Sequence, residues 1–200
     1  NSVFPADAQF FAHPTSAATL RASANAPNRR EGAPAVVLPT RIVEEREVIE
    51  LGGRSIEILF LGRAHTGGDL VVHLPDEKIL FMSEAYLNRV FPAMRSAFPT
   101  EWAAMIARAQ AMDIDTYVPG HGFVDPPWVL EEELDTYRRA VLRVIEQATL
   151  QHEEGFDVAD AQMQINFGEL ESWSLYASQA PRAIQQVYAE IEGTLPGGNR

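Results

Sequence analysis

Three side chains that can bind a metal ion lie along one stretch of the chain, between Phe60 and Gly122. They are His65 in Ala-His-Thr-Gly-Gly-Asp, Glu84 at the end of Leu-Phe-Met-Ser-Glu, and His121 in Pro-Gly-His-Gly. Each lies just past an apolar run typical of a β-strand. Strand ends far apart in sequence can converge, because neighbouring strands lie about 4.8 Å apart. Two imidazoles and a carboxylate recur around catalytic divalent metals, so the pattern predicts a metal centre at these strand ends.

The residues around these motifs predict a sheet built from hairpins. Runs over 43–51 and 55–61 flank Gly52-Gly53, a dipeptide suited to a two-residue hairpin turn, and runs over 70–74 and 78–82 flank a Pro-Asp-Glu turn. A further strand is expected over 113–118. These ribbons are typical of an antiparallel sheet.

Helical spacing of apolar residues predicts the remaining elements. A first helix follows Pro14, after a short strand over 9–12, and a second begins at Thr100 as its N-cap. After Pro127 we expect a long amphipathic helix, a short one over 157–164, and a last one beginning near Pro181, a favoured first-turn residue. The sum is an α/β fold in which a mostly antiparallel sheet is flanked by helices.

In their order, the three motifs resemble the C-terminal half of the metallo-β-lactamase superfamily. That family shows a glycine-flanked His-Thr, an apolar strand ending in Gly-Asp, and Pro-Gly-His-Gly. The resemblance implies a four-layer αββα sandwich, with residues 1–125 as part of that domain and 126–200 as a helical region packed on it. It also implies that His65 is the last ligand of a first zinc site, that Glu84 stands where the family has a bridging aspartate, and that His121 completes a second site.

The activity that the resemblance implies is zinc-dependent hydrolysis. Metal-activated water would attack a small-molecule lactam, lactone, thioester, or sulfate or phosphate ester, and the sequence does not choose among these. It assigns neither catalytic nor substrate-binding residues, although Tyr86, Arg89 and Arg95 follow Glu84 in a loop that could touch a substrate. Asp69 could hydrogen-bond a metal-bound histidine or, as a turn aspartate, its own backbone.

Two departures from the family pattern leave alternatives open. Ser83-Glu84 replaces Gly-Asp, and the motif His-x-His-x-Asp-His is absent from the 200 residues. The segment Ala-His-Pro before the first helix resembles the passage that follows this motif in the family, so we expect the motif upstream of Asn1. Without it, the three groups could form a mononuclear site that suits iron as well as zinc. Alternatively, the chain is a non-catalytic fragment or binding scaffold with an incomplete metal site.

Charge and composition indicate which classes of binding partner to expect for this chain. The chain carries 28 acidic and 16 basic residues, so its field repels phosphate backbones and nucleic acid is not expected as a partner. No apolar run approaches the roughly 20 residues that span a bilayer, and without cysteine there is neither a disulfide nor a thiolate ligand. An incomplete sandwich would leave an apolar sheet face uncovered, which makes a homodimer possible. The sequence does not indicate a cellular compartment for the protein.

Overall fold

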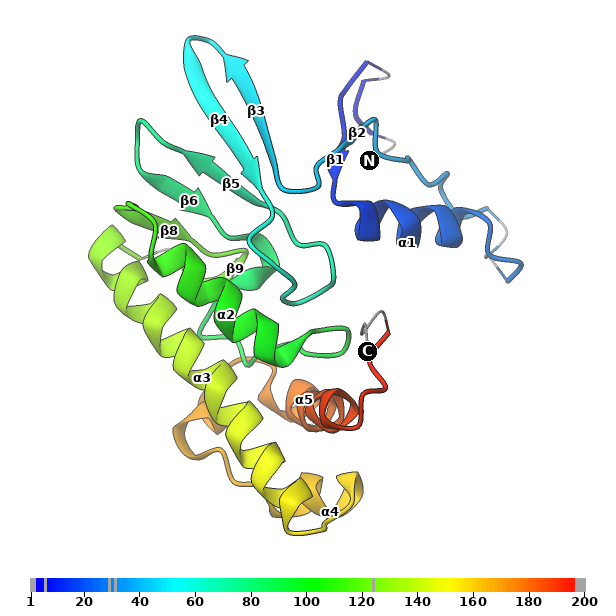
Figure 1. The fold of residues 1–200 in the computed structure, drawn as a ribbon, viewed down its shortest axis with the longest axis vertical. Coiled ribbons are helices and arrows are strands. Elements are labelled where there is room, and N and C mark those ends of the chain that lie inside the picture. The colour runs from blue at the N-terminus through cyan, green and yellow to red at the C-terminus, as the bar shows by residue number, and fades with distance from the viewer. Residues whose placement is uncertain (1–2, 6, 29, 31, 124, 197–200) are drawn as a thin grey trace.

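A five-stranded sheet forms the centre of the structure, a computed structural model that describes residues 3–5, 7–28, 30, 32–123 and 125–196 (Figure 1). Its strand order is β3-β4-β5-β6-β8. The strands are β3 (Arg46–Leu51), β4 (Arg54–Leu59), β5 (Val71–Leu74), β6 (Ile79–Phe81) and β8 (Thr116–Val118). The first four pair antiparallel, and β8 joins β6 in parallel. The predicted α/β fold with a mostly antiparallel sheet is confirmed.

Both predicted hairpins are present. Gly52 and Gly53 connect β3 to β4 with φ angles of 61° and 79°, the left-handed conformation that a two-residue turn requires and that glycine adopts without strain. The ladder registers Leu59 with Val71, and Leu80 with both His73 and Tyr117. These residues therefore share one face of the sheet, and that face carries the core.

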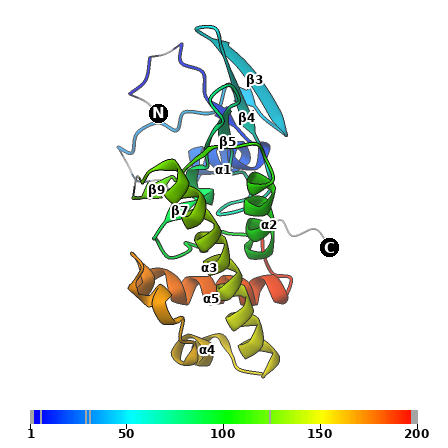
Figure 2. The same ribbon diagram turned by 90° about the vertical axis from the view of Figure 1, so that its left-hand side faces the viewer.

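Helices lie on the core side of the sheet. They are α2 (Pro99–Gln110), α3 (Pro127–Glu153), α4 (Val158–Gln164) and α5 (Tyr176–Ile191). Figures 1 and 2 both show α2 and α3 on one side of the sheet, with α5 crossing beyond them. Long α3 packs against α2, α5 and β8. Apolar side chains at helical spacing, such as Trp102 and Ile106, are fully buried, so the amphipathic pattern in the sequence faces the sheet as predicted.

Two predicted helix starts were wrong. The last helix begins at Tyr176, and Pro181 lies inside it. Proline there removes one backbone hydrogen bond, but Tyr176 packs its ring on Phe91, with the centroids 5.2 Å apart, and this contact holds the extra turn in place. Helix α2 begins at Pro99, and its N-cap is Phe98 instead of Thr100.

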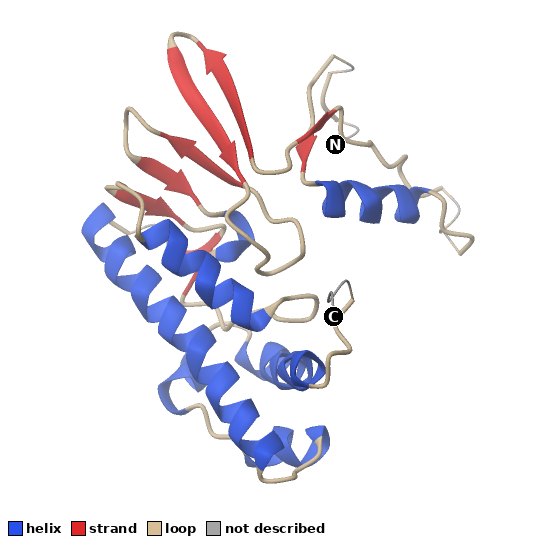
Figure 3. Cartoon of the chain, in the orientation of Figure 1, coloured by secondary structure: helices blue, strands red, loops and turns tan. Residues whose placement is uncertain are grey.

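The N-terminal elements form a smaller layer. Strand β1 (Phe11–Ala12) pairs in parallel with β2 (Arg41–Ile42), and α1 (Pro14–Ala24) follows β1. Figure 3 shows this helix at the side of the sheet away from α3. The start of α1 touches the loop that carries His65, because Ser16 Oγ donates to the Gly68 carbonyl at 3.1 Å.

The face of the sheet opposite the core is also apolar. Ile58, Val72, Phe81 and Val118 lie in one row across β4, β5, β6 and β8, and Phe81 is 41% exposed.

Among the described residues, no helix combines the length and the apolar character needed to cross a membrane.

Candidate metal centre

Glu84 and His121 meet at one end of the sheet. Glu84 lies in the short 3-10 helix η1 (Ser83–Ala85) directly after β6, and His121 opens β9 (His121–Gly122) shortly after β8. One Glu84 oxygen, Oε1, is 2.8 Å from His121 Nε2. Both side chains are partly open to solvent, at 38% and 66%. The fold therefore brings together a carboxylate and an imidazole that lie at the ends of two neighbouring parallel strands.

Backbone packing explains why glycines flank His121. Strand β9 pairs in parallel with β7 (Leu87–Asn88), and the Gly120 amide donates to the Tyr86 carbonyl at 2.9 Å. A Cβ on Gly120 would collide with the Ser83 carbonyl, and one on Gly122 would collide with the Asn88 carbonyl. Only glycine allows this approach, so the Pro-Gly-His-Gly motif sets His121 against the Glu84 segment.

Ser83 carries backbone strain immediately before Glu84. Its φ angle is 51°, in the left-handed region that costs a residue with a Cβ about 1–2 kcal/mol. This is the position where the family pattern noted above has glycine. The strained residue lies between the end of β6 and Glu84, and strain of this kind tends to gather at functional sites.

His65 does not group with this pair in the described part of the chain, and its ring contacts a different residue. It sits in the loop between β4 and β5, and its ring packs edge-on against Trp102 with centroids 5.7 Å apart. Trp102 Nε1 in turn donates to the carbonyl of Ala85, the neighbour of Glu84, at 2.9 Å. His65 Nδ1 is buried and has no hydrogen-bond partner in the described part of the chain. This imidazole nitrogen is therefore available to bind a ligand. The His65 ring contacts the same tryptophan whose indole is bonded to the residue after Glu84.

Asp69 closes the turn after His65. Its carboxylate accepts hydrogen bonds from the Thr66 amide at 2.6 Å and from Thr66 Oγ1 at 2.8 Å. These bonds fix the Thr-Gly-Gly-Asp loop. A hydrogen bond from a metal-bound histidine to Asp69 stays a prediction.

The three residues fit a divalent metal in donor chemistry and partly in arrangement. Imidazole nitrogen and carboxylate oxygen are the ligands that zinc takes in hydrolytic sites. Glu84 and His121 are in contact, and the unpaired Nδ1 of His65 is the kind of buried polar atom that a ligand would satisfy. Across residues 3–196, the gaps given above apart, no three His, Asp or Glu side chains form a group able to hold an ion.

The other three histidines have partners elsewhere. His13 Nδ1 accepts from the Thr15 amide at the start of α1, and burial lowers the pKa of His13. His73 Nδ1 lies 3.0 Å from Glu57, and His152 Nε2 lies 3.8 Å from Glu192.

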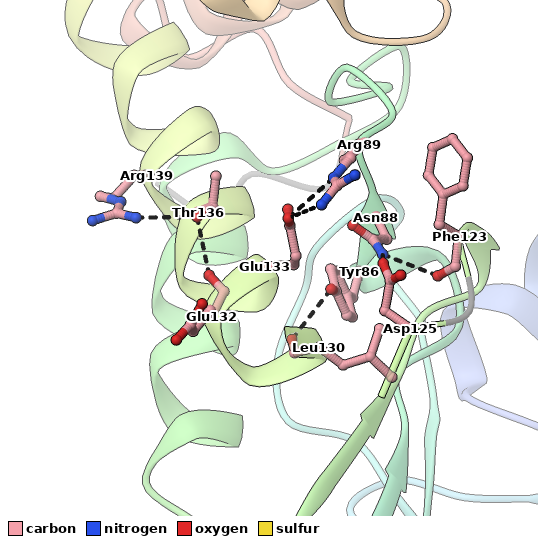
Figure 4. Close-up of polar contacts among 10 residues, drawn as sticks. All are labelled: Tyr86, Asn88, Arg89, Phe123, Asp125, Leu130, Glu132, Glu133, Thr136 and Arg139. Atoms are coloured by element: carbon pink, nitrogen blue, oxygen red, sulfur yellow. Dashed lines mark hydrogen bonds and ion pairs between the residues drawn. The ribbon is translucent and has the colours of Figure 1, made fainter. Parts of the chain in front are cut away.

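The residues that follow Glu84 support the loop of His121. Tyr86, fully buried, donates its hydroxyl to the Leu130 carbonyl at 3.2 Å. Arg89 Nε binds Glu133 at 3.0 Å, and its guanidinium lies 5.7 Å from the centre of the Phe123 ring. Figure 4 shows the bonds of Tyr86 and Arg89, on either side of β7, to Leu130 and Glu133 of α3. Tyr86 is therefore a packing residue in this structure, and Arg89 is held by an ion pair.

Asn88 was not singled out by the sequence. It is fully buried, and its Nδ2 donates to the Phe123 carbonyl at 2.9 Å and to Asp125 Oδ2 at 3.1 Å (Figure 4). These bonds tie down the residues just after His121. A lone asparagine at a strand end carries no sequence signal for this role, because its partners lie in a distant loop.

Solved structures show which fold this is. The chain is similar to the stereoselective inverting sec-alkylsulfatase Pisa1 from Pseudomonas sp., at 16% identity and a TM-score of 0.61, over 78% of this chain and 27% of that one. It is also similar to the DIM-1 metallo-β-lactamase, at 19% identity and a TM-score of 0.50, over 66% of this chain and 57% of that one. These likenesses show the metallo-β-lactamase fold over part of the chain, in agreement with the sequence motifs.

Sequence comparison adds one partial match. The chain is 27% identical over 78 residues to the 2,4-dinitroanisole O-demethylase subunit alpha of Nocardioides sp. (strain JS1661), covering 38% of this chain and 24% of that protein. The chain thus spans about a quarter of that protein and of the alkylsulfatase. No protein-family profile matches the chain.

Proposed function

We propose that this chain provides metal ligands for a zinc-dependent hydrolase, with His65, Glu84 and His121 as those ligands. The observation that carries the proposal is the 2.8 Å contact between Glu84 and His121, at the end of a sheet whose fold is that of a sulfatase and of β-lactamases. The donor set suits one or two zinc ions, and iron if the site is mononuclear.

A bound zinc ion would make water nucleophilic at neutral pH and polarise the scissile bond of an ester, thioester, lactone or lactam. The protein groups prepare that chemistry. Gly120 and Gly122 let β9 lie against β7, so His121 is held at the Glu84 carboxylate. The Trp102 ring packs edge-on against the His65 imidazole. Zinc would replace the contact between His121 and Glu84, because both groups bind it through the same atoms.

We propose a small-molecule substrate, with neither nucleic acid nor membrane as a partner. The net charge of −12 disfavours polyanions. The likeness to a sec-alkylsulfatase adds sec-alkyl sulfate esters to the substrates worth testing.

A second candidate is a binding scaffold without catalysis. The observation that favours it is that the described residues group only two of the three donors. The apolar row across β4, β5, β6 and β8, in which Phe81 is 41% exposed, would suit association with a second copy of the chain. A scaffold of this kind would not bind zinc tightly, so a measurement of zinc affinity distinguishes the two candidate functions.

The hydrolase proposal is tested by metal removal and return. We expect the purified chain to hydrolyse at least one member of a panel of chromogenic lactams, lactones, thioesters and sulfate esters. A strong chelator should abolish this activity, and added zinc should restore it, because the nucleophile depends on the ion. The zinc content of the same samples is measured by mass spectrometry. Activity that persists in the chelator at zero zinc content would contradict the proposal, and a chain that never binds zinc would favour the scaffold.

A further inference from the structure

The hydroxyl of Tyr137 on α3 is an unsatisfied polar group in the core. The side chain is fully buried, and its hydroxyl has no hydrogen-bond partner among the described residues. Leaving a buried donor unpaired costs folding free energy, and such groups in native proteins call for a specific explanation. A phenylalanine at this position would fill nearly the same space without that cost.

The aromatic neighbours of Tyr137 adjoin the backbone segment that carries Glu84. Its ring lies 5.8 Å from the ring of Tyr86 and 6.0 Å from that of Trp102. Tyr86 comes two residues after Glu84, and Trp102 is bonded to the carbonyl of Ala85. The backbone segment that carries Glu84 therefore lies against the aromatic cluster that contains Tyr137.

Electrostatics agrees with this placement. Burial, and after it the negative charge of Glu84, raises the pKa of the Tyr137 hydroxyl well above its ordinary value. The phenol therefore stays protonated at any working pH and keeps a proton to donate. Trp102 also contacts His65, so two rings that each carry an unpaired polar atom, His65 Nδ1 and the Tyr137 hydroxyl, flank the same indole.

We propose that Tyr137 is a positioning residue whose hydroxyl donates to the Glu84 carboxylate once that carboxylate holds a metal ion. This inference rests on the proposed function. In the structure, Glu84 Oε1 is engaged by His121, yet an ionised carboxylate has about four acceptor sites. When the ion takes over from the direct contact with His121, Glu84 can turn one free lone pair to the buried phenol. Hydrogen bonds of this kind orient the ligand and raise metal affinity.

The test is Tyr137→Phe, which removes one oxygen atom and keeps the ring. We expect zinc affinity, measured by competition with a chromophoric chelator, to fall by about 10- to 100-fold. We expect the urea midpoint of the metal-free protein to stay the same or rise, because an unsatisfied donor is gone. A purely structural tyrosine would not move zinc affinity while sparing metal-free stability.

Tyr117→Phe is the matched control. Tyr117 is also buried, but its hydroxyl donates to the Ala109 carbonyl at 3.3 Å. This variant should lose metal-free stability and keep the zinc affinity of the wild type. If Tyr137→Phe binds zinc as tightly as the wild type does, the inference is overturned and the proposed function stands. If the wild type itself binds no zinc, the proposed function is overturned, and the inference with it.

Discussion

Replacement of His121 by alanine is expected to weaken zinc binding by more than about 100-fold, since losing a hydrogen-bonding partner of a ligand already costs 10- to 100-fold and His121 is itself a proposed ligand. Its Nε2 is the atom that meets Glu84. Without it, Glu84 and His65 are the two proposed ligands that remain, and the Glu84 side chain is partly exposed. Competition with a chromophoric chelator measures the change directly.

The same substitution should hardly change the fold. The His121 side chain is 66% exposed, and exposed ion pairs contribute about 0–1 kcal/mol to stability. The free energy of unfolding of the metal-free variant should therefore stay within about 1 kcal/mol of the wild type. His152→Ala is the control, because this histidine also faces a glutamate, Glu192, but lies far along α3. Equal zinc affinity in the His121 and His152 variants would contradict the assignment.

Gly122→Ala is expected to lower the free energy of unfolding by about 2–5 kcal/mol, the sum of left-handed strain and overpacking. The φ angle of Gly122 is 103°, and an added Cβ would collide with the Asn88 carbonyl of the paired strand β7. The collision can be relieved only by parting β7 from β9, and this would move His121 away from Glu84. Zinc affinity should therefore fall together with stability. Urea unfolding and chelator competition measure the two effects.

Gly53→Ala separates strain from collision. Gly53 has a φ angle of 79°, and nothing lies within 4 Å of the place that an added Cβ would take. This variant should lose about 1–2 kcal/mol from backbone strain alone and keep its zinc affinity. Equal losses of stability at the two glycines would show that the close approach of β9 to β7 is not what holds His121.

The sequence predicted those parts of the fold that depend on local patterns. The Gly52-Gly53 turn and the alternation along β4 specify a hairpin through backbone conformation and through a buried face, and both are present. The ends of helices were less predictable. Helix α5 starts before Pro181 because Tyr176 packs on aromatic side chains that come together only in the folded chain. Capping rules use the local sequence alone, so they do not predict such contacts.

For the candidate site too, the sequence predicted the residues that belong to local motifs and missed those that depend on distant neighbours. Glycine-flanked His121 and the strand-end Glu84 were visible in the sequence, and the structure places them in contact. Asn88 and Tyr137 were not visible, because a buried asparagine and a core tyrosine gain a role only from neighbours distant in sequence. Trp102 is a core residue, as its helical spacing predicts, yet it also links His65 to the segment of Glu84.

The most direct test of the shared metal centre is a zinc titration followed in long-range ¹H–¹⁵N spectra of the imidazole rings. The chain has five histidines, so each ring can be assigned by single substitution. We expect the ring nitrogens of His65 and His121 to shift together at one stoichiometry, while those of His13, His73 and His152 stay in place. Shifts at His121 without His65, or at the three other histidines, would contradict a metal centre built from His65, Glu84 and His121.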